Sequence, residues 1–453
     1  MKHKTFFASR IGLIAATVGS AVGLGNVWRF PAEVQANGGA AFLIVYALCV
    51  LVLGIPVMIG EFALGREGRS DAVGSFINTG GRRGWWIVGA WGTLASYLIL
   101  CFYMVVAGWT FEYLIQSVTG DLFEPVASGE SLNSMFSSKM ETMTATSYSP
   151  LIYTYLMIVL NIAILMAGVQ KGIERISSVM MPVLFLILLV FVGFSLSLPG
   201  ASEGLRFFLN PDFSKITPEV IINALGQAFF SLSLGMGILI TYASYFPRDV
   251  KLGRTAVTVS VLDMVVAVMM GLIIFPAVTS FGLTGESMRG ATLVFVTLPE
   301  VFSNMPASQL WAILFFLLLT VAALTSTISI AEVSVAFICN RFKVSRVKGC
   351  LIVLLPLFIL SSMCALSFGP LSHITVAGLN IFEALDTVAT NIMLPVCSIG
   401  VCLFVGWKAP EQLLRDQLTN YGSFNSRIYT PVQISVRYLC PILIAIVFIS
   451  YFL

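Results

Sequence analysis

An apolar run near the start of the chain is interrupted by closely spaced glycines, in the segment GSAVGLGNVWRFP at residues 19–31. Each glycine destabilises a helix by up to about 1 kcal/mol relative to alanine, so this density predicts an unwound stretch. Unwinding frees backbone carbonyls, which suit a hard cation such as Na⁺, and exposes a helix N-terminus that attracts a carboxylate. The alternative is close helix packing through Gly19 and Gly23, whose spacing matches a GxxxG motif. Asn26 and Arg29 favour a cavity, because a guanidinium in an apolar segment needs water or a partner, for which Asp386 is a candidate.

Later apolar runs carry a second interruption and further polar groups. The segment SLSLGMG at 231–237 combines hydroxyls with a glycine break, and LTST at 324–327 places hydroxyls side by side. Such hydroxyls also bond back to their own helix, and Phe230 and Met236 fit an ordinary core equally well. Asp263 stands alone in an apolar run, where an unpaired carboxylate costs several kcal/mol. A cation or a proton is therefore expected beside Asp263.

Membrane helices must position these residues. Of 453 residues, 58% are hydrophobic and 10% are charged, against about 25% charged in a soluble domain. The apolar runs are continuous and reach the ~20 residues that a helix needs to cross a bilayer, whereas strands of a membrane barrel alternate. Eleven transmembrane helices are predicted, near 12–36, 40–65, 84–117, 150–169, 175–197, 220–246, 254–283, 310–340, 346–367, 375–406 and 432–453.

Charges between these runs predict the orientation. Lys and Arg gather in alternate loops, which by the positive-inside rule places the N-terminus in the cytoplasm and, with an odd number of spans, the C-terminus outside. The net charge is +3, and the Lys and Arg residues do not form a basic stripe, so no nucleic-acid partner is expected. The eight cysteines lack metal-binding spacing, and no cleavage site follows the first run, which is expected to stay as a helix. These features predict a multi-pass protein of the cell membrane.

The two interrupted runs are the first and the sixth of the predicted spans. Paired breaks in corresponding halves point to an inverted repeat with a binding site at its centre. We expect one domain over 1–453, with a first repeat at about 10–198, a second at about 220–408 and an extra helix at about 432–453. The short segments 198–219 and 284–309 are expected to hold small helices over an outer mouth.

Two other functional classes remain open on these grounds. An ion channel also uses glycine breaks and carbonyl ligands, although the sequence contains no repeated filter motif. A membrane-embedded enzyme needs a catalytic cluster, and the two histidines, His3 and His373, both lie near span ends with no metal cluster or nucleophile motif around them. Concentrative uptake that requires Na⁺ separates a transporter from both.

Several motifs carry a resemblance to a known family. They are GSAVGLGNVWRFP at 19–31, NGGAAF at 37–42, KGIER at 171–175, SLSLGMG at 231–237, ITYASY at 240–245 and LTSTISI at 324–330. On these motifs, from Ser9 to about Tyr451, the chain resembles the neurotransmitter:sodium symporter family and looks most like its bacterial members that carry hydrophobic amino acids. The resemblance implies symport of Na⁺ with hydrophobic and aromatic L-amino acids by alternating access. It implies no enzyme activity, and it leaves the oligomeric state open.

The resemblance also implies two sodium sites and a substrate site. The first sodium site combines the substrate carboxylate with Ala21, Asn26, Ser231 and Asp263. The second consists of Gly19, Val22, Ala322, Thr325 and Ser326. The substrate site consists of Ala21, Leu24, Gly25, Ile99, Tyr103, Phe230, Ser231, Ser233, Met236, Ser326, Ser329 and Ile330. Met236 stands where a leucine-specific relative has an aromatic residue, and its flexible thioether suits larger side chains.

The resemblance further implies moving parts. An outer latch joins Arg29 to Asp386, Trp28 and Tyr245 lie near the inner path, and local unwinding of the fifth span involves Gly172 and Pro182. The inner latch departs from the family pattern, because its positions are occupied by Lys4 and Asn340. Chloride-dependent relatives have an Asn in the seventh span, whereas Asp263 supplies a fixed charge here. Transport without chloride is therefore expected.

Overall fold

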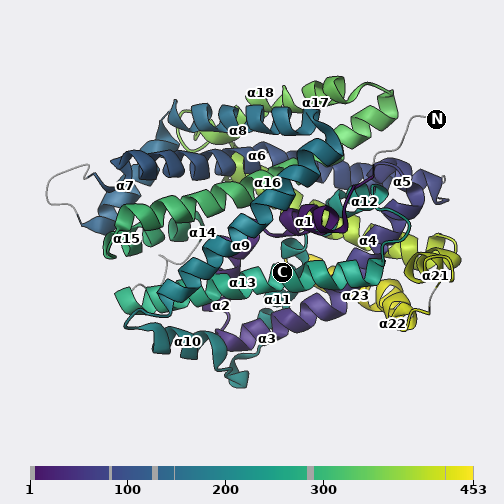
Figure 1. The fold of residues 1–453 in the computed structure, drawn as a ribbon, viewed down its shortest axis with the longest axis horizontal. Coiled ribbons are helices and arrows are strands. Elements are labelled where there is room, and N and C mark those ends of the chain that lie inside the picture. Colours follow the sequence, from purple (N-terminus) through teal and green to yellow (C-terminus); the bar gives the residue numbers. More distant parts are fainter. Residues whose placement is uncertain are drawn as a thin grey trace.

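The computed structural model describes residues 6–80, 84–124, 131–146, 148–282, 290–423 and 425–451, except for the side chain of Trp28. Long helices lie side by side along the long axis of the molecule, and short helices cover its two ends (Figure 1). Lys4, one of the two expected inner-latch residues, and the side chain of Trp28 lie outside the described part of the chain.

The first half of the chain contains the helices of the predicted first repeat and two short helices beyond residue 198. Their bounds are α1 Arg10–Ala21, η1 Gly25–Arg29, α2 Phe30–Ala36, α3 Ala40–Cys49, η2 Val50–Gly54, α4 Ile55–Gly68, α5 Ala72–Asn78, α6 Trp86–Thr119, η3 Asp121–Phe123, α7 Leu132–Ala145, α8 Ser149–Met166, η4 Val169–Glu174, α9 Arg175–Ser195, α10 Ala201–Leu209 and η5 Phe213–Lys215.

The second half continues in the same manner. Its helices are α11 Pro218–Ser231, α12 Ile238–Ser244, α13 Leu252–Phe281, α14 Gly290–Thr292, η7 Leu293–Thr297, α15 Leu298–Ser303, α16 Ser308–Phe342, α17 Arg346–Leu354, α18 Leu357–Leu366, α19 Ile381–Asp386, η8 Thr387–Met393, α20 Leu394–Leu403, η9 Phe404–Lys408, α21 Gln412–Thr419, α22 Tyr429–Ile434, η10 Ser435–Leu439 and α23 Cys440–Ser450. A two-stranded antiparallel hairpin, β1 Thr375–Val376 and β2 Leu379–Asn380, precedes α19. The predicted start of the tenth span at 375 was therefore wrong, because the chain turns back in this hairpin before Asn380 caps the helix.

The helices confirm an all-α membrane fold. Among the described residues, nine helices are long and apolar enough to cross a membrane, and the first predicted span adds a tenth that bends by 63° between Ala21 and Gly25. The predicted sixth span is split into α11 and α12, each shorter than these crossings. The count of eleven spans stays a prediction. The predicted small helices are present as α10, α14 and α15.

The breaks occur where the glycines predicted them. Between α11 and α12 the backbone enters the left-handed region at Ser233, Gly235 and Gly237, with φ of 53°, 78° and 72°. Gly235 also has no room for a side chain, because a Cβ there would lie 2.3 Å from Ser398 Oγ. The freed amide of Gly235 donates to Glu61 Oε1 of α4 at 2.7 Å, so a buried carboxylate replaces the lost helical acceptor. The core surrounds this region, since α16 packs along α6, and α1 packs on α9, α13 and α16.

Candidate functional site

The two helix breaks meet at a cavity of about 40 Å³ in the middle of the bundle. It is lined by Ser20, Ala21, Gly23, Leu24, Gly25, Ile99, Phe102, Tyr103, Phe230, Ser231, Ser233, Met236, Ser326 and Ile330. One water needs about 10–15 Å³ by this measure, so the cavity has room for only a few waters. A bulkier occupant requires the flexible walls to move, and Phe230 and Met236 are side chains that can do so.

The substrate residues predicted from the sequence converge here, with one exception. Ser329 does not line the cavity, because its hydroxyl accepts a 2.8 Å hydrogen bond from Tyr242 and donates one of 2.8 Å to the Thr325 carbonyl. Ser20, Gly23 and Phe102 line the cavity although they were not predicted to do so.

Backbone groups form one wall of the cavity. The amide of Leu24 donates to the Tyr103 hydroxyl at 3.3 Å. A Cβ on Gly23 would lie 2.8 Å from Ser326 Oγ, and one on Gly25 would lie 3.0 Å from the Phe230 ring, so a larger residue at either position would have to displace a neighbouring side chain. Residues with backbone amides at the broken first helix therefore line the cavity beside the Tyr103 hydroxyl, an arrangement suited to a carboxylate.

A buried cluster of oxygen and nitrogen atoms lies around Asp263 of α13. Ser231 Oγ donates to Asp263 Oδ2 at 2.7 Å, and the Tyr46 hydroxyl lies 3.4 Å from the same oxygen. Asn26 Nδ2 donates to Asp263 Oδ1 at 2.9 Å and to Ser231 Oγ at 3.2 Å, while Asn26 Oδ1 accepts from the Gly23 amide at 3.2 Å. Three of the four residues predicted for the first sodium site therefore contact one another, and the fourth, Ala21, lines the adjoining cavity.

A second cluster joins α1 to α16. The Ser326 hydroxyl lies 3.5 Å from the Gly19 carbonyl and 3.4 Å from the Val22 carbonyl, and Thr325 Oγ1 lies 3.0 Å from the Ala322 carbonyl. All five residues predicted for the second sodium site are thus neighbours. Carbonyl and hydroxyl oxygens are the ligands that a hard cation prefers.

The fifth span reaches this second cluster through Met181. A Cβ on Gly19 would lie 3.5 Å from Met181 Cε, so the thioether covers the cluster from the α9 side. The helix is widened into a π-helical turn over η4, which contains Gly172, and continues through Pro182 without a break. Gly172 packs against the Ile164 carbonyl, 2.1 Å from where a Cβ would be. Gly172 and Pro182 therefore lie on one continuous helical segment, and the predicted local unwinding is not present in this structure.

The outer latch differs from the prediction. Arg29 forms an ion pair with Glu33, one helical turn further on, with 3.8 Å between Nε and Oε1. Its guanidinium also lies over the Phe230 ring, 4.6 Å from the centroid. Within the described chain no ion pair joins Arg29 to Asp386, so the predicted latch is not closed in this structure. The reason is local, because Glu33 follows Arg29 at the i,i+4 spacing of helical neighbours.

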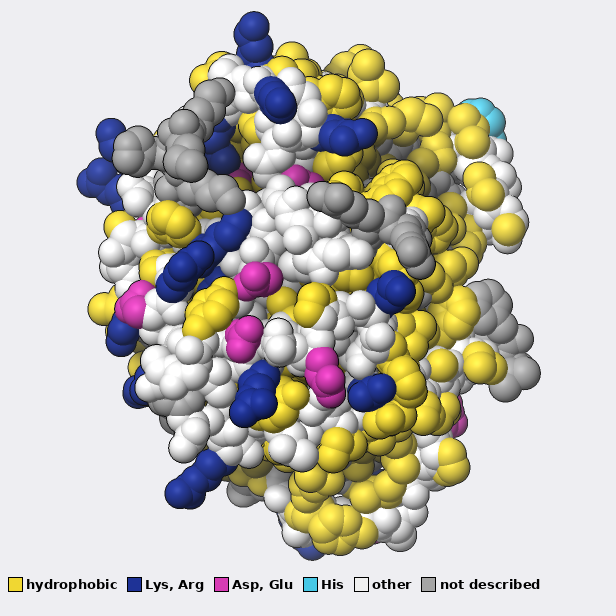
Figure 2. Space-filling view, turned by 90° about the vertical axis from the view of Figure 1, so that its right-hand side faces the viewer, with side chains coloured by type: hydrophobic (Ala, Val, Ile, Leu, Met, Phe, Trp, Pro, Cys, Tyr) yellow, Lys and Arg dark blue, Asp and Glu magenta, His cyan; other side chains and the backbone are white. Residues whose placement is uncertain are grey.

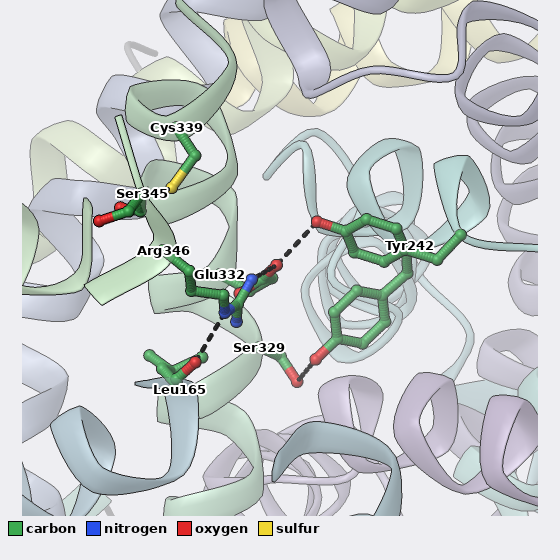
Figure 3. Close-up of polar contacts among 8 residues, drawn as sticks. Leu165, Tyr242, Ser329, Glu332, Cys339, Ser345 and Arg346 are labelled. Carbon is green, nitrogen blue, oxygen red and sulfur yellow. Dashed lines mark hydrogen bonds and ion pairs between the residues drawn. The ribbon is translucent and has the colours of Figure 1, made fainter. Parts of the chain in front are cut away.

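The inner end carries a polar network that the sequence did not predict. Arg346 forms a two-pronged ion pair with Glu332, at 2.9 Å and 2.6 Å, and the Tyr245 hydroxyl donates to Glu332 Oε1 at 2.7 Å (Figure 3). The Glu332 side chain is fully buried, and that of Arg346 is 25% exposed. Asn340, the other expected inner-latch residue, instead donates to Asp71 Oδ2 at 3.1 Å. Tyr245 belongs to this network through its hydrogen bond to Glu332, and its place near the inner path stays a prediction.

Comparison with known proteins decides the family. The family model described as the sodium:neurotransmitter symporter family matches residues 4–135 and 137–453. The chain belongs to this family. It is therefore a multi-pass membrane protein that couples transport to sodium, and it is not an enzyme.

Individual relatives of this symporter cover nearly its whole length. A protein named as an uncharacterized sodium-dependent transporter of Bacillus subtilis is 36% identical over 449 residues, covering 98% of this chain and 97% of the relative. A similarly named protein of Haemophilus influenzae is 34% identical and covers 99% of the chain and 98% of the relative. The crystal structure of MhsT in complex with L-phenylalanine superimposes with a TM-score of 0.89 at 40% identity, covering 98% of this chain and 99% of that one.

Sequence reasoning missed some polar residues of the symporter that carried a usable signal. Glu332 and Glu61 are lone carboxylates in apolar runs, which is the same signal that identified Asp263. Tyr46 carried no such signal, because a tyrosine in an apolar span is common. From the sequence, Arg346 is only one of several basic residues in a loop. Its ion pair with Glu332 forms because the chain turns back between α16 and α17.

Proposed function

We propose that the protein takes up hydrophobic and aromatic L-amino acids by symport with two Na⁺ ions, through alternating access and without chloride. The observation that carries this proposal is the cavity at the two helix breaks, which combines backbone groups with apolar walls. Backbone amides of Leu24 and Gly25 and the Tyr103 hydroxyl bind the substrate carboxylate. The carbonyls of Ala21 and Phe230, together with that of Ser233, accept its ammonium group.

The apolar wall selects the side chain. None of the described residues that line the cavity is charged, and its apolar side chains include Ile99, Phe102, Met236 and Ile330. An acidic or basic substrate has to bury an unpaired charge there, which costs several kcal/mol, or a factor of ~10³ or more in affinity. The phenylalanine complex of MhsT, at 40% identity, supports an aromatic substrate for this chain too.

The two oxygen clusters are the proposed sodium sites. The cluster around Asn26, Ser231 and Asp263 adjoins the cavity, so the substrate carboxylate completes the first site and couples ion binding to substrate binding. The second site, at Thr325 and Ser326, ties α1 to α16 across the break in the first helix. The fixed charge of Asp263 balances the ions in place of chloride.

The gates follow from the polar residues on either side of the cavity. We propose that Arg29 exchanges Glu33 for Asp386 as the outer path closes, and that Tyr245, with Trp28, guards the inner path. Figure 2 shows an end of the molecule over which Lys and Arg side chains are spread, and by the positive-inside rule this end is proposed to face the cytoplasm.

Uptake into proteoliposomes tests this function. Purified full-length protein is reconstituted, an inward Na⁺ gradient is applied, and labelled L-phenylalanine is competed against each of the twenty amino acids. We expect Leu, Ile, Val, Met, Tyr and Trp to compete and Glu and Lys to fail. Competition by glutamate or lysine equal to that by leucine would contradict the proposed substrate class. Labelled substrate that equilibrates without accumulating would indicate a channel.

A further inference from the structure

A groove of about 400 Å³ lies between the first and seventh spans, outside the site described above. It is lined by residues of α1, of the loop before α13 and of the first turns of α13, namely Arg10, Leu13, Ile14, Val250, Lys251, Arg254, Thr255 and Thr258. The volume of the groove is about ten times that of the central cavity. The proposed transport mechanism uses none of the residues that line the groove.

The groove combines a cationic rim with an apolar floor. The side chains of Arg10, Lys251 and Arg254 are exposed, whereas Leu13 and Val250 are 2% and 6% exposed. One carboxylate opposes the rim, since Asp249 pairs with Arg10 at 2.8 Å. The hydrogen bond from Arg10 lowers the pKa of Asp249, which is therefore ionised at neutral pH. Among the described residues, the lining of the groove contains three basic side chains and no acidic one, and Asp249 lies beside it, so the lining carries a net positive charge.

The position of the groove matches the interface of one membrane leaflet. Its basic residues stand at the N-terminal ends of α1 and α13, and α13 contacts α21, which lies at the right-hand side of Figure 1. Figure 2 shows that side of the molecule, with Lys and Arg side chains spread over it. By the positive-inside rule this end meets the cytoplasmic leaflet, which contains anionic lipids. The apolar floor continues from this end along α1 and α13, which run into the membrane-spanning region.

We infer that an anionic glycerophospholipid of the cytoplasmic leaflet binds in this groove. Its phosphate lies among Arg10, Lys251 and Arg254, and an acyl chain covers Leu13 and Ile14. Charge complementarity selects the anionic headgroup, because basic pockets between membrane helices at the cytoplasmic side bind such headgroups. A zwitterionic lipid has no net charge to match the rim.

Such a lipid ties α1 to α13 at the inner end. The segment before α1 already contacts the inner side, since the Phe7 amide donates to the Tyr245 carbonyl at 3.1 Å. Arg66 fixes the opposite wall by donating to the Val250 carbonyl at 2.5 Å. A lipid that bridges these walls stabilises the arrangement in which the inner path is closed. This consequence rests on the proposed alternating-access transport, whereas the binding site itself does not.

Lipid retention tests the site directly. The full-length protein is purified in detergent, mixed with phosphatidylglycerol or phosphatidylcholine, and examined by native mass spectrometry without Na⁺ or amino acid. We expect a phosphatidylglycerol adduct that excess soluble glycerol phosphate does not displace, and no comparable phosphatidylcholine adduct. Because the readout involves neither ion nor substrate, failure of the proposed transport function leaves this result unaffected.

Two variants locate the adduct. Lys251→Gln with Arg254→Gln removes rim charge, and Ile14→Trp fills the floor without changing charge. The matched control, Arg341→Gln with Lys343→Gln, removes the same charge from exposed positions at the C-terminal end of α16. We expect the rim variant to bind phosphatidylglycerol on the order of tenfold more weakly, the floor variant to lose the adduct, and the control to match wild type. Unchanged binding in the rim variant, or equal binding of the two lipids by wild type, would overturn the inference.

Discussion

The Ser231 hydroxyl donates a 2.7 Å hydrogen bond to Asp263 Oδ2, which joins the broken sixth span to the middle of the seventh. Both side chains are buried, with exposures of 2% and 0%. The carboxylate therefore lies behind Ser231, which lines the central cavity, with donors around it and no described cation in its hydrogen-bonded cluster. This relationship makes Asp263 the proposed balancing charge for the sodium ions.

The first prediction is that transport does not require chloride. Two Na⁺ ions add charge to a site whose zwitterionic substrate adds none, and at an effective dielectric of 20 one missing charge is worth about 4 kcal/mol at close range. We expect wild-type uptake in gluconate to equal uptake in chloride, and Asp263→Asn to lose uptake in gluconate. Vesicle uptake with the two anions measures this. A collapse of wild-type uptake without chloride would remove Asp263 from its proposed role.

The second prediction concerns the sodium site between α1 and α16. Thr325→Ala and Ser326→Ala each delete one oxygen from the cluster with the Gly19 and Val22 carbonyls, so the Na⁺ concentration for half-maximal uptake should rise several-fold. Thr320→Ala is the matched control, because that buried hydroxyl bonds only to the Phe316 carbonyl of its own helix at 2.7 Å. Identical sodium curves for all three variants would place the ion elsewhere.

The third prediction tests the cavity wall. Met236 is 5% exposed and lines the cavity, and replacing its flexible thioether with a rigid ring reduces the room for large substrates. We expect Met236→Phe to weaken inhibition by tryptophan more than inhibition by leucine in competition assays. Leucine serves as the internal control for folding. Equal losses for the two amino acids would mean that Met236 does not contact the substrate side chain.

The fourth prediction concerns the inner ion pair. Removing one partner of a buried pair leaves an unpaired charge and costs roughly 3 kcal/mol or more. We expect Glu332→Gln and Arg346→Gln each to lower the thermal unfolding midpoint in detergent, and the double variant to lose less than the sum of the two. Additive losses in this double-mutant cycle would show that the two side chains do not interact.

The fold and most of the site were accessible from the sequence because their signals are local. Glycine density predicted both helix breaks, and the lone carboxylate predicted a cation or a proton beside Asp263. The family resemblance, not residue spacing, supplied the other members of the Asp263 and Ser326 clusters, which lie together in the structure. Ser329 lies one turn from Ser326 on the same helix, yet its hydroxyl accepts a hydrogen bond from Tyr242. The helical spacing of residues does not predict that contact.

The gates were less accessible because they depend on tertiary packing and conformational state. Arg29 has two acidic partners within reach of its span, and the structure contains the pair with Glu33. Arg346 meets Glu332 only because the chain reverses between α16 and α17, so no spacing rule predicts their contact. In the family pattern the inner latch falls on Lys4 and Asn340, whereas the structure pairs Arg346 with Glu332.

Accumulation of labelled L-phenylalanine against its gradient tests sodium-coupled uptake most directly. Proteoliposomes are given an inward Na⁺ gradient, the same gradient with a sodium ionophore, or choline in place of Na⁺. The account predicts transient accumulation above the external concentration with the gradient alone, and none in the other two conditions. Undiminished accumulation in choline would contradict it.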